Sequence, residues 1–179
     1  LAESELPPNH PSLAGYHINL VTIYEANGHY DKLLETAQKA LTIRLDALGE
    51  NHPLTASAYN SFGGAHSYLL NSNEALKNYR KELTILKNTV GEEHLSTISS
   101  YNNVGHSLLA LGNEEEALSN YNKAMALCEQ MLQEDHMLFT NTSRFLVGLN
   151  GNLSEQIQSQ KRHLENAEAL VGENSHILS

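Results

Sequence analysis

A period of 42 residues runs through this sequence and constrains its fold more than any other feature. Histidines recur at this interval: His10, His52, His94 and His136. Other identical residues recur with the same spacing: Tyr59 and Tyr101, Asn60 and Asn102, Gly63 and Gly105, and Asn71 and Asn113. A repeat of this length is one supersecondary unit, which buries its apolar face only by stacking on its neighbours. The sequence therefore predicts an elongated array of stacked units.

Each unit is expected to contain two helices. Pro53 suits the first position of a helix, where the missing N–H would have no intrahelical acceptor. Small and apolar residues then follow at steps of three and four, the spacing of one helix face: Ala58, Phe62, Ala65 and Leu69. In the next unit Asn113 precedes three glutamates, which is typical of a capped helix start. We therefore predict an all-α fold of antiparallel helix pairs without a sheet.

The repeat also predicts the division of the chain. The expected units span 7–48, 49–90, 91–132 and 133–171. The fourth is shortened, because Gly151 follows Gly112 by 39 rather than 42 residues, and divergent, because its second helix carries polar residues where the third unit has Ala117, Tyr121 and Ala124. Residues 1–6 match the end of a preceding helix, and residues 172–179 match the start of a truncated fifth unit. We therefore expect this chain to be a piece of a longer array, whose open ends favour end-to-end self-association.

The motifs of the repeat resemble a known family. They are Leu48-Gly49-Glu50-Asn51-His52-Pro53, Tyr101-Asn102-Asn103-Val104-Gly105 and Leu111-Gly112-Asn113-Glu114-Glu115-Glu116-Ala117-Leu118. They resemble the tetratricopeptide repeat (TPR) in the 42-residue version found in kinesin light chains. The resemblance implies a right-handed superhelical solenoid, in which the first helix of each pair lines a concave groove. The sequence departs from the family pattern at Glu82, where an alanine is expected, and at Val21 and Val147, where a small residue is expected.

Composition excludes several classes of partner. The formal net charge is −10, and the Lys and Arg residues are scattered, whereas a nucleic-acid partner requires a basic stripe. The single cysteine excludes an internal disulfide framework and a cysteine-rich zinc site. The sequence contains no apolar run long enough to span a membrane and does not begin with a charged-then-apolar signal segment. We expect a cytoplasmic protein without a nucleic-acid or membrane partner.

The sequence shows no catalytic motif, and we predict neither an enzyme nor a bound cofactor. Cys128 lies on the second helix of the third unit, where a buried hydrophobic role is favoured over a nucleophilic one. The four periodic histidines lie in equivalent loops of successive units, too far apart to share a zinc ion. We predict for them a structural role, packed at the joints between units and bonded to nearby backbone, and no metal site.

The family resemblance places a set of first-helix positions on the concave side. The candidate groove residues are Ser57, Asn60, Gly64, Tyr68, Ser99, Asn102, His106, Asn141 and Arg144. An asparagine amide both donates and accepts hydrogen bonds, so Asn60 and Asn102 could hold the main chain of an extended peptide. The alternative is an ordinary solvated helix face. Arg144 is the only cation among these positions, so the paired Lys/Arg clamp of chaperone-binding relatives is missing.

Two functions remain open at this point. The first is a protein–protein interaction scaffold that binds a peptide segment of a partner in the concave groove. The second is a sensor or regulatory arm of a larger multidomain signalling protein or enzyme. The sequence of the flanking regions would separate them, because a catalytic domain beside the array favours the second.

Overall fold

The residues that the computed structural model describes are 10–131 and 137–151, and almost all of them are helical. The helices are α1 (Pro11–Ala26), α2 (Tyr30–Leu48), α3 (Pro53–Tyr68), α4 (Ser72–Thr89), α5 (Leu95–Ala110) and α6 (Glu114–Met131). A further helical segment covers residues 137–151. Within this described part there is no strand, which confirms the predicted all-α fold. The predicted second helix of the fourth unit and both predicted partial units lie outside the described residues.

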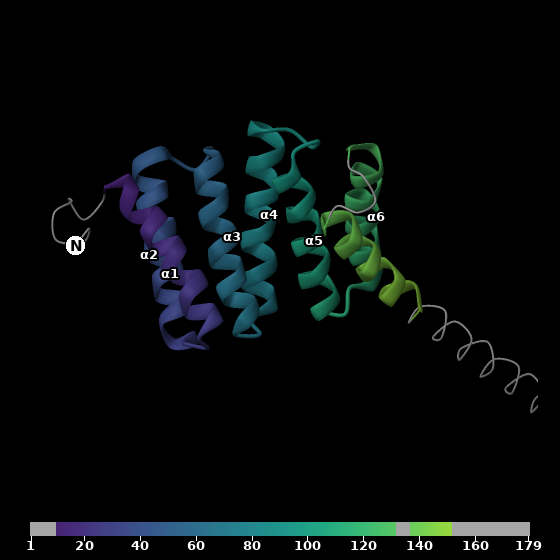
Figure 1. Ribbon diagram of the computed structural model, residues 1–179, viewed down its shortest axis with the longest axis horizontal. Coiled ribbons are helices and arrows are strands. Elements are labelled where there is room, and N and C mark those ends of the chain that lie inside the picture. Colours follow the sequence, from purple (N-terminus) through teal and green to yellow (C-terminus); the bar gives the residue numbers. More distant parts are fainter. Residues whose placement is uncertain (1–9, 132–136, 152–179) are drawn as a thin grey trace, which may run out of the picture.

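Each helix packs on the next one along the chain, α1 also contacts α3, and the helix pairs follow one another along the length of the molecule (Figure 1). Helix α1 packs on α2, α3 on α4 and α5 on α6, and the pairs are joined to one another through α2–α3 and α4–α5. The helices within a pair are antiparallel because only short loops connect them. Stability in such an array is a sum over neighbouring contacts rather than the property of one central core.

The periodic histidines cap the first helix of each described pair. The ring Nδ1 accepts a hydrogen bond from the backbone N–H two residues later, at 3.2 Å in His10, 3.1 Å in His52 and 3.2 Å in His94. This bond satisfies one of the N–H groups that an α-helix leaves without a partner at its start. The predicted bond to nearby backbone is therefore confirmed at three positions. The predicted packing at the joints is not general, because His94 is exposed; His136 lies outside the described residues.

The joint between successive pairs repeats a second capping arrangement. Gly49 and Gly91 adopt φ values of 76° and 93°, which L-residues with a side chain rarely adopt. Their carbonyls accept hydrogen bonds from the hydroxyls of Thr55 (2.8 Å) and Thr97 (2.7 Å). The loop before α3 and the loop before α5 are thus held by the same local contacts.

Glycine and tyrosine meet at the contact between the two helices of a pair. A Cβ atom on Gly63 would lie 3.0 Å from the ring of Tyr79, and one on Gly105 would lie 2.9 Å from the ring of Tyr121. Both tyrosines are buried, and Tyr121 also stacks on Phe145 with ring centroids 5.1 Å apart. These contacts pair a small residue on the first helix with a large aromatic residue on the second, in both the second and the third unit.

Cys128 is fully buried beside Ile98, Tyr101 and Leu127, which confirms its predicted role as a small core residue. Burial raises the pKa of its thiol above the ordinary value, so the thiolate needed for nucleophilic attack is disfavoured. Among the described helices, none combines the length and the apolarity that crossing a lipid bilayer requires. The described residues also contain no cluster of His, Cys, Asp and Glu side chains suited to a metal ion.

Candidate functional site

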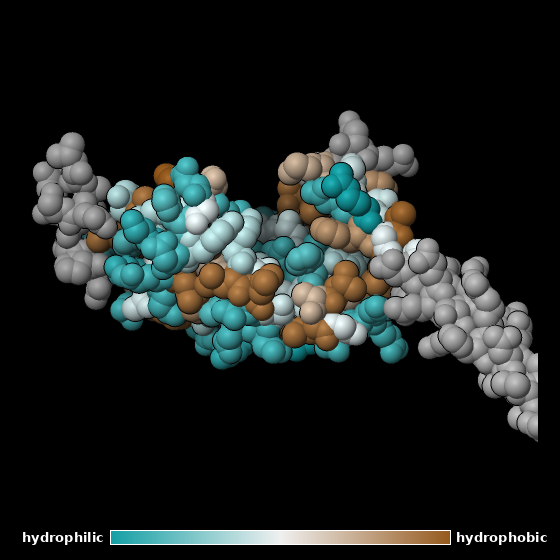
Figure 2. All heavy atoms as spheres, turned by 90° about the horizontal axis from the view of Figure 1, so that it is seen from below, coloured by the Kyte–Doolittle hydropathy of each residue, from teal (hydrophilic) through white to brown (hydrophobic). Residues whose placement is uncertain are grey.

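Two hollows lie between α3 and α5, which are the first helices of neighbouring pairs, and α4 forms their floor. The polar hollow has a volume of about 230 Å³ and is lined by Pro53, Ser57, Asn60, Glu82, Leu86, Ser96 and Ser99. The tyrosine hollow has a volume of about 400 Å³ and is lined by Gly64, Ser67, Tyr68, Leu70, Tyr79 and His106. The space-filling view shows the outline of the molecule hollowed near the middle of its length (Figure 2).

The two hollows follow one another along the same pair of helices. On α3 the polar hollow uses Ser57 and Asn60, and the tyrosine hollow begins one turn later at Gly64. Helix α4 runs in the opposite direction, so Glu82 lies under the first hollow and Tyr79, one turn earlier, under the second. Together they form a groove about as long as α3, and we refer to it as the α3–α5 groove.

A buried carboxyl group forms the floor of the polar hollow. Glu82 is only 4 % exposed, and its Oε2 accepts a hydrogen bond from Nδ2 of Asn60 at 3.0 Å. Burial raises the pKa of this carboxyl to about 7, although the hydrogen bond from Asn60 and the nearby Ser100 hydroxyl oppose the rise. The raised pKa means that Glu82 changes its charge near neutral pH, which an exposed glutamate does not do.

Aromatic side chains dominate the tyrosine hollow. The Tyr68 ring stacks on Tyr30 with centroids 6.2 Å apart, and its hydroxyl donates a hydrogen bond to the Glu25 carboxylate. This bond raises the pKa of Tyr68 to about 12. The wall and the floor are therefore suited to apolar or aromatic side chains that end in a polar group.

The structure places the nine candidate groove residues in three groups. Six of them line the α3–α5 groove: Ser57, Asn60 and Ser99 in the polar hollow, and Gly64, Tyr68 and His106 in the tyrosine hollow. Asn141 and Arg144 lie on the helical segment 137–151, half-buried and exposed respectively, and line neither hollow. Asn102 is the exception, because it does not lie on an open face.

Asn102 is 6 % exposed, and its Nδ2 donates a hydrogen bond to the Thr142 hydroxyl at 2.7 Å. The prediction that this asparagine faces the groove is wrong. The reason lies in the second helix of the same unit, at the residue 22 positions after the asparagine. In the third unit this residue is Ala124, which leaves the asparagine free to reach the next unit. In the second unit it is Glu82, whose carboxyl inserts beside Asn60 and opens a polar space.

A stability measurement can check the position of Asn102. We expect Asn102→Ala to lower the free energy of unfolding in urea by about 0.5–1.5 kcal/mol, because it removes a buried hydrogen bond to the next unit. The loss stays moderate because the Thr142 hydroxyl still donates to the Leu138 carbonyl at 2.8 Å. Lys77→Ala, at an exposed position of α4, serves as a control and should change stability by less than about 0.5 kcal/mol. Equal stability of the Asn102 variant and the wild type would contradict the buried position.

Sequence reasoning missed several residues that line the groove, including Glu82, Ser96, Tyr79 and Leu70. The only signal for Glu82 was its departure from the alanine that the repeat has at Ala124. Sequence reasoning also missed an ion cluster around Glu92, at the joint before α5. Glu92 contacts Lys87 at 2.8 Å and Lys123 at 2.9 Å, and these ammonium groups, with the hydroxyl of Tyr101, lower its pKa to about 2.

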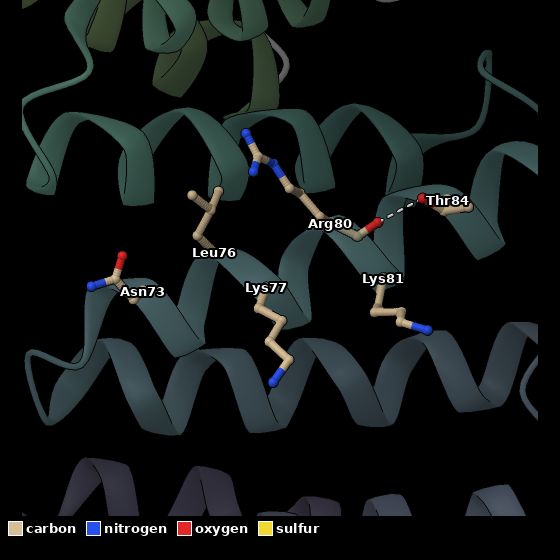
Figure 3. Close-up of a pocket in the computed structure, with 6 residues that line it drawn as sticks. All are labelled: Asn73, Leu76, Lys77, Arg80, Lys81 and Thr84. Carbon is tan, nitrogen blue, oxygen red and sulfur yellow. Dashed lines mark hydrogen bonds between the residues drawn. The ribbon is translucent and has the colours of Figure 1, made fainter.

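A third hollow, of about 470 Å³, lies on the surface of α4 and is lined by three basic residues among others (Figure 3). Each cation already has a carboxylate partner: Lys77 with Glu74, Arg80 with Glu116, and Lys81 with Glu50. The side chains also diverge, because Lys77 and Lys81 point away from Leu76 and Arg80. This surface therefore offers no convergent cation site for an acidic ligand.

Comparison with known proteins decides the family. A family model described as the tetratricopeptide repeat matches residues 12–88 and 65–130. The chain belongs to the tetratricopeptide repeat family. Its fold is accordingly the predicted right-handed solenoid of antiparallel TPR helix pairs. None of the curated proteins matches this chain in sequence.

Solved structures share the fold of this TPR protein at low identity. One is a kinesin-light-chain-like protein of Podosopora anserina with nearly identical TPR-like repeats, at 20 % identity and a TM-score of 0.74, covering 89 % of this chain and 75 % of that one. Another is BtubC (BKLC) from P. vanneervenii, at 23 % identity and a TM-score of 0.75, covering 84 % and 61 %. The first TPR of Spaghetti (RPAP3), solved with the HSP90 peptide SRMEEVD, has 16 % identity and a TM-score of 0.58, covering 79 % and 95 %.

Proposed function

We propose that this TPR protein is an interaction scaffold that binds an extended peptide segment of a partner protein in the α3–α5 groove. The observation that carries the proposal is the alignment of the polar and tyrosine hollows along one groove, on the side lined by first helices. A related TPR structure that holds a peptide, that of RPAP3, supports peptide binding as a function of the fold.

The chemistry of the groove walls favours recognition over catalysis. The polar hollow presents hydroxyl and amide groups, which can donate to and accept from a peptide main chain. The tyrosine hollow presents ring faces and the exposed side chain of Leu70, which suit apolar side chains of the peptide. Alternate side chains of an extended segment would then enter the two hollows, while its backbone bonds to the walls.

Blocking the groove tests this function. A displayed library of random short peptides is selected against the wild-type chain, and the synthetic peptides recovered are titrated against two tryptophan variants. Ser57→Trp fills the mouth of the polar hollow from an exposed position of α3. We expect it to weaken binding by about tenfold or more, which corresponds to about 1.4 kcal/mol.

The matched control is Thr84→Trp, which places the same side chain on the exposed surface of α4 outside the groove. We expect this variant to bind the selected peptides with the affinity of the wild type, and both variants to keep the helical circular dichroism of the wild type. If Thr84→Trp weakens binding and Ser57→Trp does not, the ligand binds the α4 surface and the groove proposal fails.

A further inference from the structure

The polar hollow holds a carboxyl group that has no cationic partner among the described residues. The pKa of Glu82 is set by burial, by the hydrogen bond from Asn60 and by the nearby Ser100 hydroxyl, with no contribution from a Lys, Arg or His. The six other residues that line the hollow are all uncharged. Tyr79, one turn away on α4, is a titratable group near Glu82. Burial and the negative charge of the Glu82 carboxylate raise the pKa of Tyr79.

The hydrogen-bonding capacity of Glu82 is only partly used. An ionised carboxylate has two oxygens and accepts about four hydrogen bonds. Asn60 supplies one of them, to Oε2, at 3.0 Å. A buried carboxyl that lines an open hollow and keeps acceptor capacity is a site that a donor from outside can complete.

We propose that the polar hollow binds a lysine side chain of the partner peptide, whose ammonium group pairs with the Glu82 carboxylate. This inference rests on the proposed function and adds a specificity to it. The ammonium group carries three donors, one for the carboxylate and two for neighbouring oxygens. The hydroxyls of Ser57, Ser96 and Ser99 line the same hollow and supply such oxygens.

The apolar part of the hollow suits the methylene stem of a lysine. Pro53 and Leu86 line the hollow together with the polar groups, and they can pack against an extended aliphatic chain. Arginine fits less well, because its planar guanidinium binds best to a carboxylate with both oxygens free. In Glu82, Oε2 is already bonded to Asn60.

The electrostatics favour the bound state. An ammonium group close to the carboxylate stabilises its charged form and lowers the pKa of Glu82 from about 7, so the pair is ionised when the peptide is bound. Because the Glu82 side chain is buried, a charge pair formed at its carboxylate interacts more strongly than a pair of exposed side chains. The net charge of −10 also attracts basic segments to the protein during encounter.

A purely structural role for Glu82 makes a different prediction. In that role the carboxyl only accepts the hydrogen bond that holds Asn60, and the side chains of a peptide do not interact with it. The experiment must therefore measure preference for lysine, which a structural role does not produce.

The probes are pools of short peptides, acetylated at the N-terminus and amidated at the C-terminus, with one fixed central residue and random flanks. The fixed residue is lysine, acetyl-lysine, norleucine or arginine. Binding to the whole chain is measured by fluorescence polarisation. We expect the lysine pool to bind about tenfold or more tightly than the norleucine and acetyl-lysine pools, the effect of one charge-assisted hydrogen bond. Arginine should fall between them.

Two variants connect the preference to this carboxyl. Glu82→Gln keeps the side-chain volume and an acceptor for Asn60 but cannot ionise, and we expect it to bind the lysine and norleucine pools within about twofold of each other. Glu129→Gln removes the same charge from an exposed position of α6 and should keep the full preference. Thermal melting of each variant confirms that it is folded at the temperature of the titration.

The outcomes separate this inference from the proposed function. If the pools bind the wild type, Ser57→Trp abolishes binding, and lysine and norleucine are equivalent, then the groove function stands and the lysine site is wrong. A lysine preference that persists in Glu82→Gln also overturns the lysine site. If no pool binds the wild-type chain, the proposed function fails together with this inference.

Discussion

Gly105→Ala is expected to destabilise the protein, although replacing glycine with alanine inside a helix normally stabilises it by about 0.5–1 kcal/mol. The new Cβ atom would lie 2.9, 3.0 and 3.1 Å from three ring atoms of Tyr121. The ring cannot withdraw easily, because it is fully buried and stacks on Phe145. Overpacking of this kind costs about 1–3 kcal/mol, which exceeds the helix-propensity gain. We therefore expect a net decrease in the free energy of unfolding, measured in urea.

Gly64→Ala is the matched control. Its Cβ atom would lie 3.6 Å from the Tyr79 hydroxyl oxygen, an ordinary contact, so the propensity gain should remain. The two alanine variants are thus expected to change stability in opposite directions. A gain in stability for both variants would show that the helices of the third pair separate without cost, and the close packing of Gly105 on Tyr121 would then not hold in solution.

Glu82→Gln is expected to change how stability depends on pH. The pKa of Glu82 is about 7 in the folded protein and near 4.5 in the unfolded chain. Between these values the folded state keeps a proton that the unfolded state releases, so this group makes stability fall as pH rises from 4.5 to 7. The difference of roughly two and a half pKa units corresponds to about 3 kcal/mol. Glutamine does not titrate, so the variant should lack this loss.

The measurement is urea unfolding of the wild type and the Gln variant from about pH 4.5 to about pH 8. Only the difference between the two proteins is used, because other groups titrate in the same range. Burial lowers the pKa of His66, so that group makes stability rise with pH and partly masks Glu82 in the wild-type curve alone. If the two curves run parallel from about pH 5 to about pH 8, the Glu82 carboxyl has an ordinary pKa and is solvated.

Glu92→Gln provides a contrast at lower pH. Contacts with Lys87, Lys123 and Tyr101 lower the pKa of Glu92 to about 2. Its contribution to stability is therefore present above pH 4.5 and is lost as pH falls toward 2. Because this carboxylate is more than one third exposed, solvent screening keeps the effect small. Its pH range does not overlap with that of Glu82.

The sequence by itself determined the architecture of this protein. The helix pairs follow from local signals that need no distant partner: the three- and four-residue spacing of apolar residues, the proline at Pro53, and the loop glycine at Gly91. The contact of Gly105 with Tyr121 was also predictable, since the repeat places the same small and large residues, Gly63 and Tyr79, in the preceding unit. The repeat thus predicts side-chain contacts between paired helices wherever successive units have the same residues.

The candidate site was decided only in part by the sequence. The family resemblance identified six residues that line the α3–α5 groove, and helical geometry agrees with it, because positions three and four apart share one face. The sequence could not show that Asn60 lines the groove and Asn102 is buried, because the two residues occupy the same position of successive units. Only the tertiary structure decided between them. Each amide donates to the acceptor that the neighbouring helices place beside it. For Asn60 this is the Glu82 carboxyl, and for Asn102 it is the Thr142 hydroxyl, which the amide can reach because the small Ala124 side chain does not block it.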